Sequence, residues 1–149
     1  MVIIVTNQSA IGRGMMTLEK LETIHARLAA LIRPFGARID GIFSCPHHPQ
    51  DGCGCRKPNT GLIDQAVDRF ALDLSHCYLV GDKRSDLEVA QKVEVPGILV
   101  MTSPYGAEAV IARDAGQLPI EYVANTFPQA VAWIEQDLLK RLNHTGSAR

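Results

Sequence analysis

Three of the four cysteines lie in one short stretch that also contains two histidines. The sequence has Cys45-Pro46-His47 and then, after five intervening residues, Cys53-Gly54-Cys55. Three thiols and one imidazole match a closed tetrahedral zinc site, and a site with four protein ligands is structural because no coordination position stays open. We predict that Cys45, His47, Cys53 and Cys55 bind zinc, with His48 as an alternative to His47. Incidental surface cysteines are the competing interpretation.

Two cations follow the last of these cysteines directly. Arg56 presents a planar fork that suits phosphate oxygens, and Lys57 presents a compact positive charge that suits a phosphoryl group in transfer. An adjacent Arg-Lys pair is also common on solvated surfaces. Because the pair follows the predicted zinc ligands, we favour an anion-binding role.

Two further polar groups follow apolar runs. Asp82 comes after Leu79-Val80-Gly81, where a carboxylate can hold Mg²⁺. Asp86 lies four residues later, and we leave open whether it interacts with the helix dipole, binds the metal or orders the loop. Thr6 and Asn7 end the first apolar run, where hydroxyl, amide and backbone N–H groups can cradle a phosphate, although turn residues of these types are common.

The elements that must position these groups alternate between strands and helices. This alternation predicts an α/β fold with a parallel sheet and helices on both faces, and ligands bind at the carboxyl ends of its strands. The expected strands are 2–5, 39–44, 77–80, 98–101 and 122–124; the expected helices are 17–32, one around 62–70, 85–93 with a serine cap, one after Gly106, and 128–142.

Composition excludes several classes of protein. The chain has 149 residues, 46% of them hydrophobic and 21% charged, which is typical of a single globular domain, with residues 144–149 expected to fray. The net charge of −1 gives no basic field for nucleic acid or anionic lipid, so we expect neither partner. The apolar N-terminal run is too short for a signal peptide or a membrane span, and we expect a cytoplasmic protein.

Taken together, five motifs closely resemble the haloacid dehalogenase superfamily, and within it the heptose bisphosphate and histidinol-phosphate phosphatases. The similarity runs from Met1 to about Val123. The motifs are Val5-Thr6-Asn7-Gln8-Ser9, Arg13-Gly14, Cys45-Pro46-His47-His48-Pro49, Cys53-Gly54-Cys55-Arg56-Lys57-Pro58 and Val80-Gly81-Asp82-Lys83.

The resemblance implies a Rossmann-like sheet and a Mg²⁺-dependent phosphatase of a small sugar phosphate. We expect heptose bisphosphate as the substrate, with histidinol phosphate as the alternative. It implies the following roles. Thr6 binds the transferring phosphoryl group and Asn7, Gln8 and Ser9 line the substrate; Cys45, His47, Cys53 and Cys55 bind zinc; Arg56 contacts the substrate phosphate, Lys57 stabilises the transition state, Asp82 binds magnesium and Lys83 contacts the substrate.

One motif of the superfamily is missing from this sequence. Its members carry an Asp-x-Asp at the end of the central strand, where the first Asp is the nucleophile and the second the general acid/base. No two aspartates here are two residues apart. We interpret Met1 as lying inside the domain, after that first strand. A misplaced start codon or a fragment of a longer chain is the favoured explanation.

This interpretation has chemical and structural consequences. Covalent phosphoryl transfer needs a positioned carboxylate, so we expect the 149 residues to hydrolyse phosphate esters poorly or not at all. A non-catalytic, zinc-stabilised phosphate-binding module is the alternative function, and a redox protein using Cys53 and Cys55 is a weaker one. We expect a monomer at full length. Without the central strand, the first and third strands either pair directly or receive another segment or chain between them.

Overall fold

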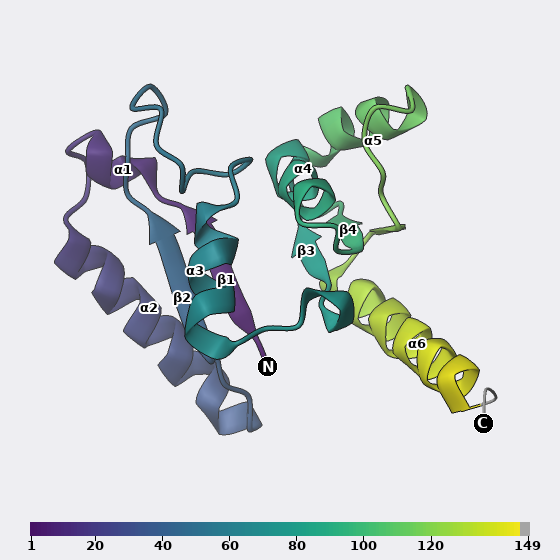
Figure 1. Ribbon diagram of the computed structural model, residues 1–149. Helices are drawn as coiled ribbons and strands as arrows, with labels where there is room; N and C mark the ends of the chain where they lie inside the picture. The colour runs from purple at the N-terminus through teal and green to yellow at the C-terminus, as the bar shows by residue number, and fades with distance from the viewer. Residues whose placement is uncertain (147–149) are drawn as a thin grey trace. The chain divides into compact units, whose positions relative to one another are not determined.

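A computed structural model of the chain describes residues 1–146 and divides into two compact units, residues 1–72 and 73–149 (Figure 1). The element order is β1 (Ile3–Asn7), α1 (Ser9–Gly12), α2 (Leu18–Ile32), η1 (Arg33–Phe35), β2 (Gly41–Cys45), α3 (Gly61–Phe70), η2 (Leu74–His76), β3 (Leu79–Gly81), α4 (Arg84–Lys92), β4 (Gly97–Val100), α5 (Gly106–Asp114), β5 (Tyr122–Ala124) and α6 (Phe127–Gly146).

In the first unit, β1 and β2 pair in parallel, with Ile3 opposite Gly41 and Asn7 opposite Cys45. Helix α3 packs on both strands. Helix α2 begins after Thr17, whose side chain accepts a hydrogen bond from the backbone N–H of Lys20, as an N-cap residue does. The parallel register places Asn7 and Cys45 at the same carboxyl edge of the sheet, where the predicted site residues follow.

The second unit is a three-layer arrangement around the parallel sheet β3-β4-β5. Successive residues of β4 point to opposite faces, as strand geometry requires. Leu99 packs with Leu87, Ala109 and Ala112 of α4 and α5 on one face. On the other face, Ile98 and Val100 pack with Ala124 and Ala130, the latter on α6. Both faces of β4 are therefore covered, which explains its continuous apolar sequence.

Most expected elements are confirmed within one to three residues, with two differences. The short helix α1 lies between the first expected strand and the first expected helix, where no apolar periodicity marks it. Helix α4 begins at Arg84, so Ser85 lies inside it and is not its cap. The expected parallel strands are confirmed, but they are divided over two sheets. Strand β1 pairs with β2 in the first sheet, and β3 pairs with β4 in the second. Helix α6 continues through Gly146, and residues 147–149 lie outside the described part.

Within residues 1–146, no helix is long and apolar enough to cross a membrane. This finding agrees with the short apolar runs of the sequence.

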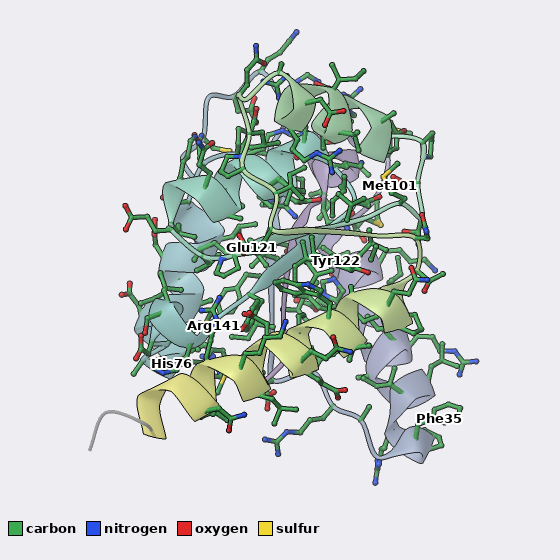
Figure 2. All side chains as sticks on the ribbon, turned by 90° about the vertical axis from the view of Figure 1, so that its right-hand side faces the viewer. Phe35, His76, Met101, Glu121, Tyr122 and Arg141 are labelled. Carbon is green, nitrogen blue, oxygen red and sulfur yellow. The ribbon has the colours of Figure 1, made fainter. Side chains whose placement is uncertain are left out.

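An aromatic cluster attaches α6 to the sheet of the second unit. The ring of Trp133 stacks on that of Tyr122, with centroids 5.3 Å apart, and meets the ring of Tyr78 edge-on at 6.4 Å. The Tyr78 hydroxyl donates to Asp137 at 2.7 Å, and the Arg141 guanidinium lies 5.3 Å from the centre of the Tyr78 ring. Tyr122 and Arg141 are labelled near α6 in Figure 2. Burial, and then the hydrogen bond to Asp137, raise the pKa of Tyr78 from 10 to about 12.

This pKa predicts a specific loss of stability at high pH. Because the folded protein holds the Tyr78 proton up to about pH 12 while an unfolded phenol releases it at about 10, stability should fall as the pH rises from 10 to 12. In an absorbance titration of phenolate, Tyr78→Phe should remove one ionisation near pH 12. Removal of an ionisation near pH 10 instead would contradict the contacts described for Tyr78.

Candidate functional site

Four side chains predicted to bind a metal converge in the first unit. The ligand atoms of Cys45, His47, Cys53 and Cys55 all lie within 4.8 Å of one another. Sulfur atoms of Cys45 and Cys53 are 3.5 Å apart, and those of Cys53 and Cys55 are 3.6 Å apart. His47 Nδ1 lies 3.5 Å from the Cys45 sulfur and 3.2 Å from the Cys55 sulfur. One loop therefore brings three thiols and one imidazole nitrogen to a single point.

These distances fit a metal ion and not a disulfide. A disulfide needs sulfurs about 2.05 Å apart. All three thiols are free, and their spacing is close to the edge of about 3.8 Å that a tetrahedron of metal–sulfur bonds about 2.3 Å long has. His48 does not belong to this group: its Nδ1 accepts the backbone N–H of Gln50, and its own N–H donates to Asp51. The choice that the sequence left open falls on His47.

The ends of the two paired strands hold this loop. Cys45 is the last residue of β2 and fully buried, and its carbonyl accepts the N–H of Gln8 at 2.8 Å. Helix α1 approaches the loop so closely that Gly12 donates its N–H to the Pro46 carbonyl, and a Cβ on Gly12 would lie 2.5 Å from the His48 nitrogen. Glycine is therefore required at position 12 for this contact.

The thiols differ in acidity. Burial, the largest effect on Cys53, raises its pKa, but hydrogen bonds from the Cys45 thiol and from the Arg56 and Cys55 backbone outweigh it and lower the pKa to about 7. Burial, followed by the neighbouring Cys45 and Cys53 thiols, raises the pKa of Cys55 to about 12. Cys53 is thus the thiol of this pair that deprotonates more readily, and thiolate is the form that binds metals.

Lys57 is attached to β1 by both its backbone and its side chain. Its N–H donates to Asn7 Oδ1 at 3.0 Å, and its carbonyl accepts from Asn7 Nδ2 at 3.1 Å. Its ammonium group donates to the Val5 carbonyl at 2.8 Å. The residue between Val5 and Asn7 is Thr6, so the structure brings two predicted phosphate-handling residues, Thr6 and Lys57, to one strand end.

The other predicted groups around Thr6 have defined places as well. Gln8 Nε2 donates to the Thr6 hydroxyl at 3.1 Å, and Ser9 is the first residue of α1. The buried Arg56 Nη1 has no hydrogen-bond partner among the described residues. A buried guanidinium nitrogen without a partner is costly, and an anionic ligand would supply one. A pocket of about 220 Å³ here is lined by Pro49, Gly52, Cys53, Arg56, Lys57, Pro58 and Asn59.

Asp82 lies in the second unit, directly after β3. The loop that carries it is fixed by Asp86, which is 5% exposed and whose Oδ2 accepts the N–H groups of Asp82 and Lys83 at 3.2 and 3.1 Å. Asp86 approaches so closely that a Cβ on Gly81 would lie 2.2 Å from the Asp86 Cβ. Of the roles left open for Asp86, the structure shows loop ordering. The expectation that Asp82 binds magnesium stays a prediction.

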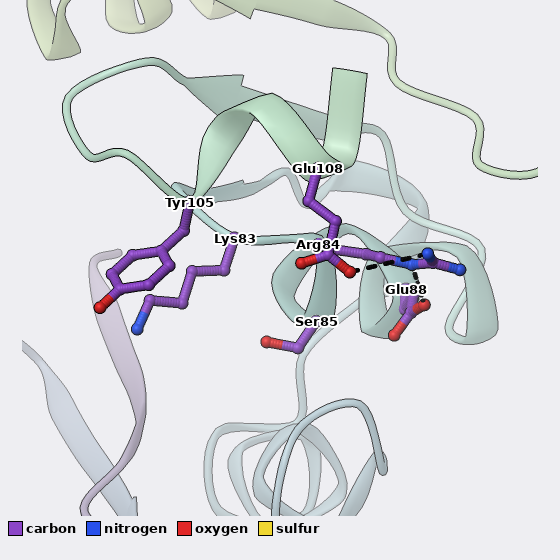
Figure 3. Close-up of a pocket in the computed structure, with 6 residues that line it drawn as sticks. All are labelled: Lys83, Arg84, Ser85, Glu88, Tyr105 and Glu108. Carbon is purple, nitrogen blue, oxygen red and sulfur yellow. Dashed lines mark hydrogen bonds and ion pairs between the residues drawn. The ribbon is translucent and has the colours of Figure 1, made fainter. Parts of the chain in front are cut away.

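Lys83 borders a second pocket, of about 390 Å³ (Figure 3). Its ammonium group lies 4.3 Å from the centre of the Tyr105 ring, within cation–π range. Arg84 pairs with Glu88 at 2.7 Å and with Glu108 at 3.7 Å, as the dashed lines in Figure 3 show. The hydroxyl of Ser85 completes the lining. This polar pocket has a cation that is oriented by an aromatic ring.

Neither Tyr105 nor the contact of Asn7 with the Lys57 backbone could be found from the sequence. Both act through the fold: Tyr105 is 22 residues from Lys83, and Asn7 is 50 residues from Lys57. No local spacing signals such contacts. For Asp86, the four-residue distance from Asp82 was a usable signal, because it lies within the first turn of the following helix.

Comparison with known proteins agrees with this geometry. The model of the HAD-hydrolase-like family matches residues 54–130. A Pseudomonas aeruginosa D-glycero-beta-D-manno-heptose-1,7-bisphosphate 7-phosphatase is 45% identical over 101 residues, which cover 68% of this chain and 57% of that protein. The bifunctional histidine biosynthesis protein HisB of Blochmanniella floridana is 36% identical over 96 residues, 64% of this chain and 27% of that protein. The chain thus spans little more than half of the first relative.

A solved structure shows the same similarity. The crystal structure of D,D-heptose 1,7-bisphosphate phosphatase from B. bronchiseptica, complexed with magnesium and phosphate, matches with a TM-score of 0.79 and 34% identity. The match covers 93% of this chain and 74% of that one. With its parallel strands and its matched residues, the chain belongs to the HAD-like hydrolase family.

Proposed function

We propose that this chain carries the phosphate-handling part of a Mg²⁺-dependent phosphatase that removes the C7 phosphate from D,D-heptose 1,7-bisphosphate. The observation that carries the proposal is the attachment of Lys57 to the strand end that presents Thr6. The unpartnered Arg56 Nη1 beside Lys57 supports it, because both are cations at one pocket. The Pseudomonas aeruginosa relative and the B. bronchiseptica structure, both heptose bisphosphate phosphatases, support this substrate.

In this proposal each group has a role that suits its chemistry. The Thr6 hydroxyl binds a phosphoryl oxygen, and the Lys57 ammonium stabilises the charge that develops on the phosphoryl group. Arg56 and Lys83 contact anionic parts of the substrate, and Asn7, Gln8 and Ser9 border it. Asp82 holds Mg²⁺, which when bound neutralises phosphoryl oxygens. The B. bronchiseptica structure with magnesium and phosphate supports that ion.

We further propose that the cysteine and histidine cluster binds structural Zn²⁺. Three thiolates and one imidazole are a donor set typical of closed zinc sites. The zinc would hold the loop that carries Arg56 and Lys57. We also propose that the enzyme is cytoplasmic, monomeric and built from one domain, and that it has no nucleic-acid or membrane partners.

The lack of an Asp-x-Asp nucleophile limits the chemistry that these 149 residues can perform. They contain no Asp-x-Asp, so we propose that they bind phosphate esters and that hydrolysis requires an Asp-x-Asp carboxylate next to Thr6 and Lys57. Two other functions have some support. The HisB similarity favours a histidinol-phosphate phosphatase. The absent Asp-x-Asp favours a non-catalytic phosphate-binding module.

Phosphate release from heptose bisphosphate and from histidinol phosphate separates these functions. The assay uses the chain and a version extended at its N-terminus by a strand that ends in Asp-x-Asp, both with Mg²⁺. Release from heptose bisphosphate by the extended version alone is the expected result. Faster release from histidinol phosphate would favour the HisB-like function, and binding without any release would favour the binding module. Absence of both binding and release would overturn the proposal.

Replacement of Lys57 tests the anion site itself. Lys57→Ala removes a charge-assisted contact, so the affinity for inorganic phosphate should fall about 10- to 100-fold in isothermal titration calorimetry. The free energy of unfolding should change by only about 1 kcal/mol, because one hydrogen bond to the Val5 carbonyl is lost. Lys20→Ala, an exposed lysine on α2, serves as the matched control and should leave the affinity unchanged. Equal affinities for both variants would rule out this role.

Replacement of cysteines tests the zinc site. Cys53→Ser removes one of four ligands and should reduce the zinc content, measured by mass spectrometry of metals, from one per chain to a small fraction. The free energy of unfolding should decrease by about 3 kcal/mol or more. Cys77→Ser is the matched control, because that thiol only donates to the Asp73 carbonyl. Unchanged zinc in Cys53→Ser would show that the ligand assignment is wrong.

A further inference from the structure

We propose that Asn7 is a positioning residue that sets the place of Lys57 relative to Thr6. The resemblance to the phosphatases implies only that Asn7 lines the substrate. In the structure both polar atoms of its carboxamide form hydrogen bonds within the protein. Oδ1 accepts the Lys57 N–H at 3.0 Å, and Nδ2 donates to the Lys57 carbonyl at 3.1 Å.

This pair of bonds replaces what a neighbouring strand would otherwise provide. An amide side chain that bonds both the N–H and the C=O of one residue fixes that residue as a strand partner would. Asn7 is the last residue of β1 and is itself held opposite Cys45 by the sheet register. The backbone of Lys57 is therefore fixed to a rigid strand end, 50 positions away in the sequence.

The direction of the Lys57 side chain follows from this attachment. From its fixed backbone the side chain reaches back along β1, and its ammonium group donates to the Val5 carbonyl at 2.8 Å. Asn7 and Val5 are the two neighbours of Thr6 in β1, so Lys57 is bonded on either side of that residue. In this proposal, Asn7 thereby sets where the Lys57 charge lies along the strand end.

An amide side chain meets this requirement because it carries both an acceptor and a donor. A carboxylate at position 7 would still accept the Lys57 N–H but has no proton to donate to the Lys57 carbonyl, and its charge would repel a phosphate. Gln8, the other amide nearby, bonds the Thr6 hydroxyl instead. The two amides thus serve different partners at the same strand end.

A double-variant cycle on phosphate binding tests the proposal, which rests on the proposed role of Lys57 in binding phosphate. Inorganic phosphate affinity is measured for the full zinc-loaded chain and for Asn7→Ala, Lys57→Ala and the double variant. Asn7→Ala should weaken binding about tenfold, and the double variant should bind no more weakly than Lys57→Ala alone. Asn125→Ala is the matched control: Asn125 is an exposed asparagine of the second unit, outside the proposed site, and its replacement should change the affinity less than about twofold.

Hydrogen exchange at the Lys57 amide gives a second readout that does not require phosphate binding. Exchange should be about tenfold faster in Asn7→Ala, unchanged in Asn125→Ala, and still slow in Asn7→Asp, which keeps the acceptor but should bind phosphate weakly. If Asn7→Ala loses its zinc or does not fold, the Asn7→Asp variant carries the test through the same two measurements.

Different results overturn different claims. Independent effects of Asn7→Ala and Lys57→Ala on the affinity, which multiply in the double variant, would overturn the positioning role. Equal losses of affinity in Asn7→Ala and Asn125→Ala would overturn it as well. Failure of the unaltered chain to bind phosphate would overturn the proposed function, while slow exchange at Lys57 that is lost in Asn7→Ala would still support the attachment by Asn7.

Discussion

The site in the first unit depends on how the long loop after β2 is held at the end of β1. This loop has no regular secondary structure to fix it between Cys45 and α3. Its constraints are the cluster of three thiols and one imidazole at one end and the carboxamide of Asn7 at the other. Arg56 follows the last cysteine of the cluster, and Lys57 is the residue that Asn7 bonds, so a small number of side-chain contacts holds the backbone of both cations.

The second unit uses a similar arrangement at the end of β3. There the carboxylate of Asp86 accepts the N–H groups of Asp82 and Lys83 and so fixes their backbone. Tyr105 then orients the Lys83 ammonium from another loop. In both units, a polar side chain bonded to backbone groups holds the residues that we propose to handle phosphate and metal. This explains why several polar residues of the predicted site contact protein groups themselves.

The sequence predicted those features that rest on local patterns. Apolar runs and their periodicity marked strands such as Tyr122–Ala124, and the spacing of Cys45, Cys53 and Cys55 marked the cluster. It could not decide between His47 and His48, because adjacent residues differ only in direction. The contact of Asn7 with Lys57 was also out of reach, since it depends on how the chain folds over 50 residues. Motif similarity supplied the proposed chemistry, which spacing alone does not contain.

We propose that a metal in the cysteine cluster orders the loop that presents Lys57. Amide hydrogen exchange, measured with the metal bound and after chelation, distinguishes this from a loop that is ordered without a metal. Chelation should speed exchange at Asn59, whose N–H donates to the Arg56 carbonyl, and at Lys57, whereas Ile98 and Leu99 in the core of the second unit stay protected. Unchanged exchange at Asn59 and Lys57 after complete loss of the metal would contradict the account.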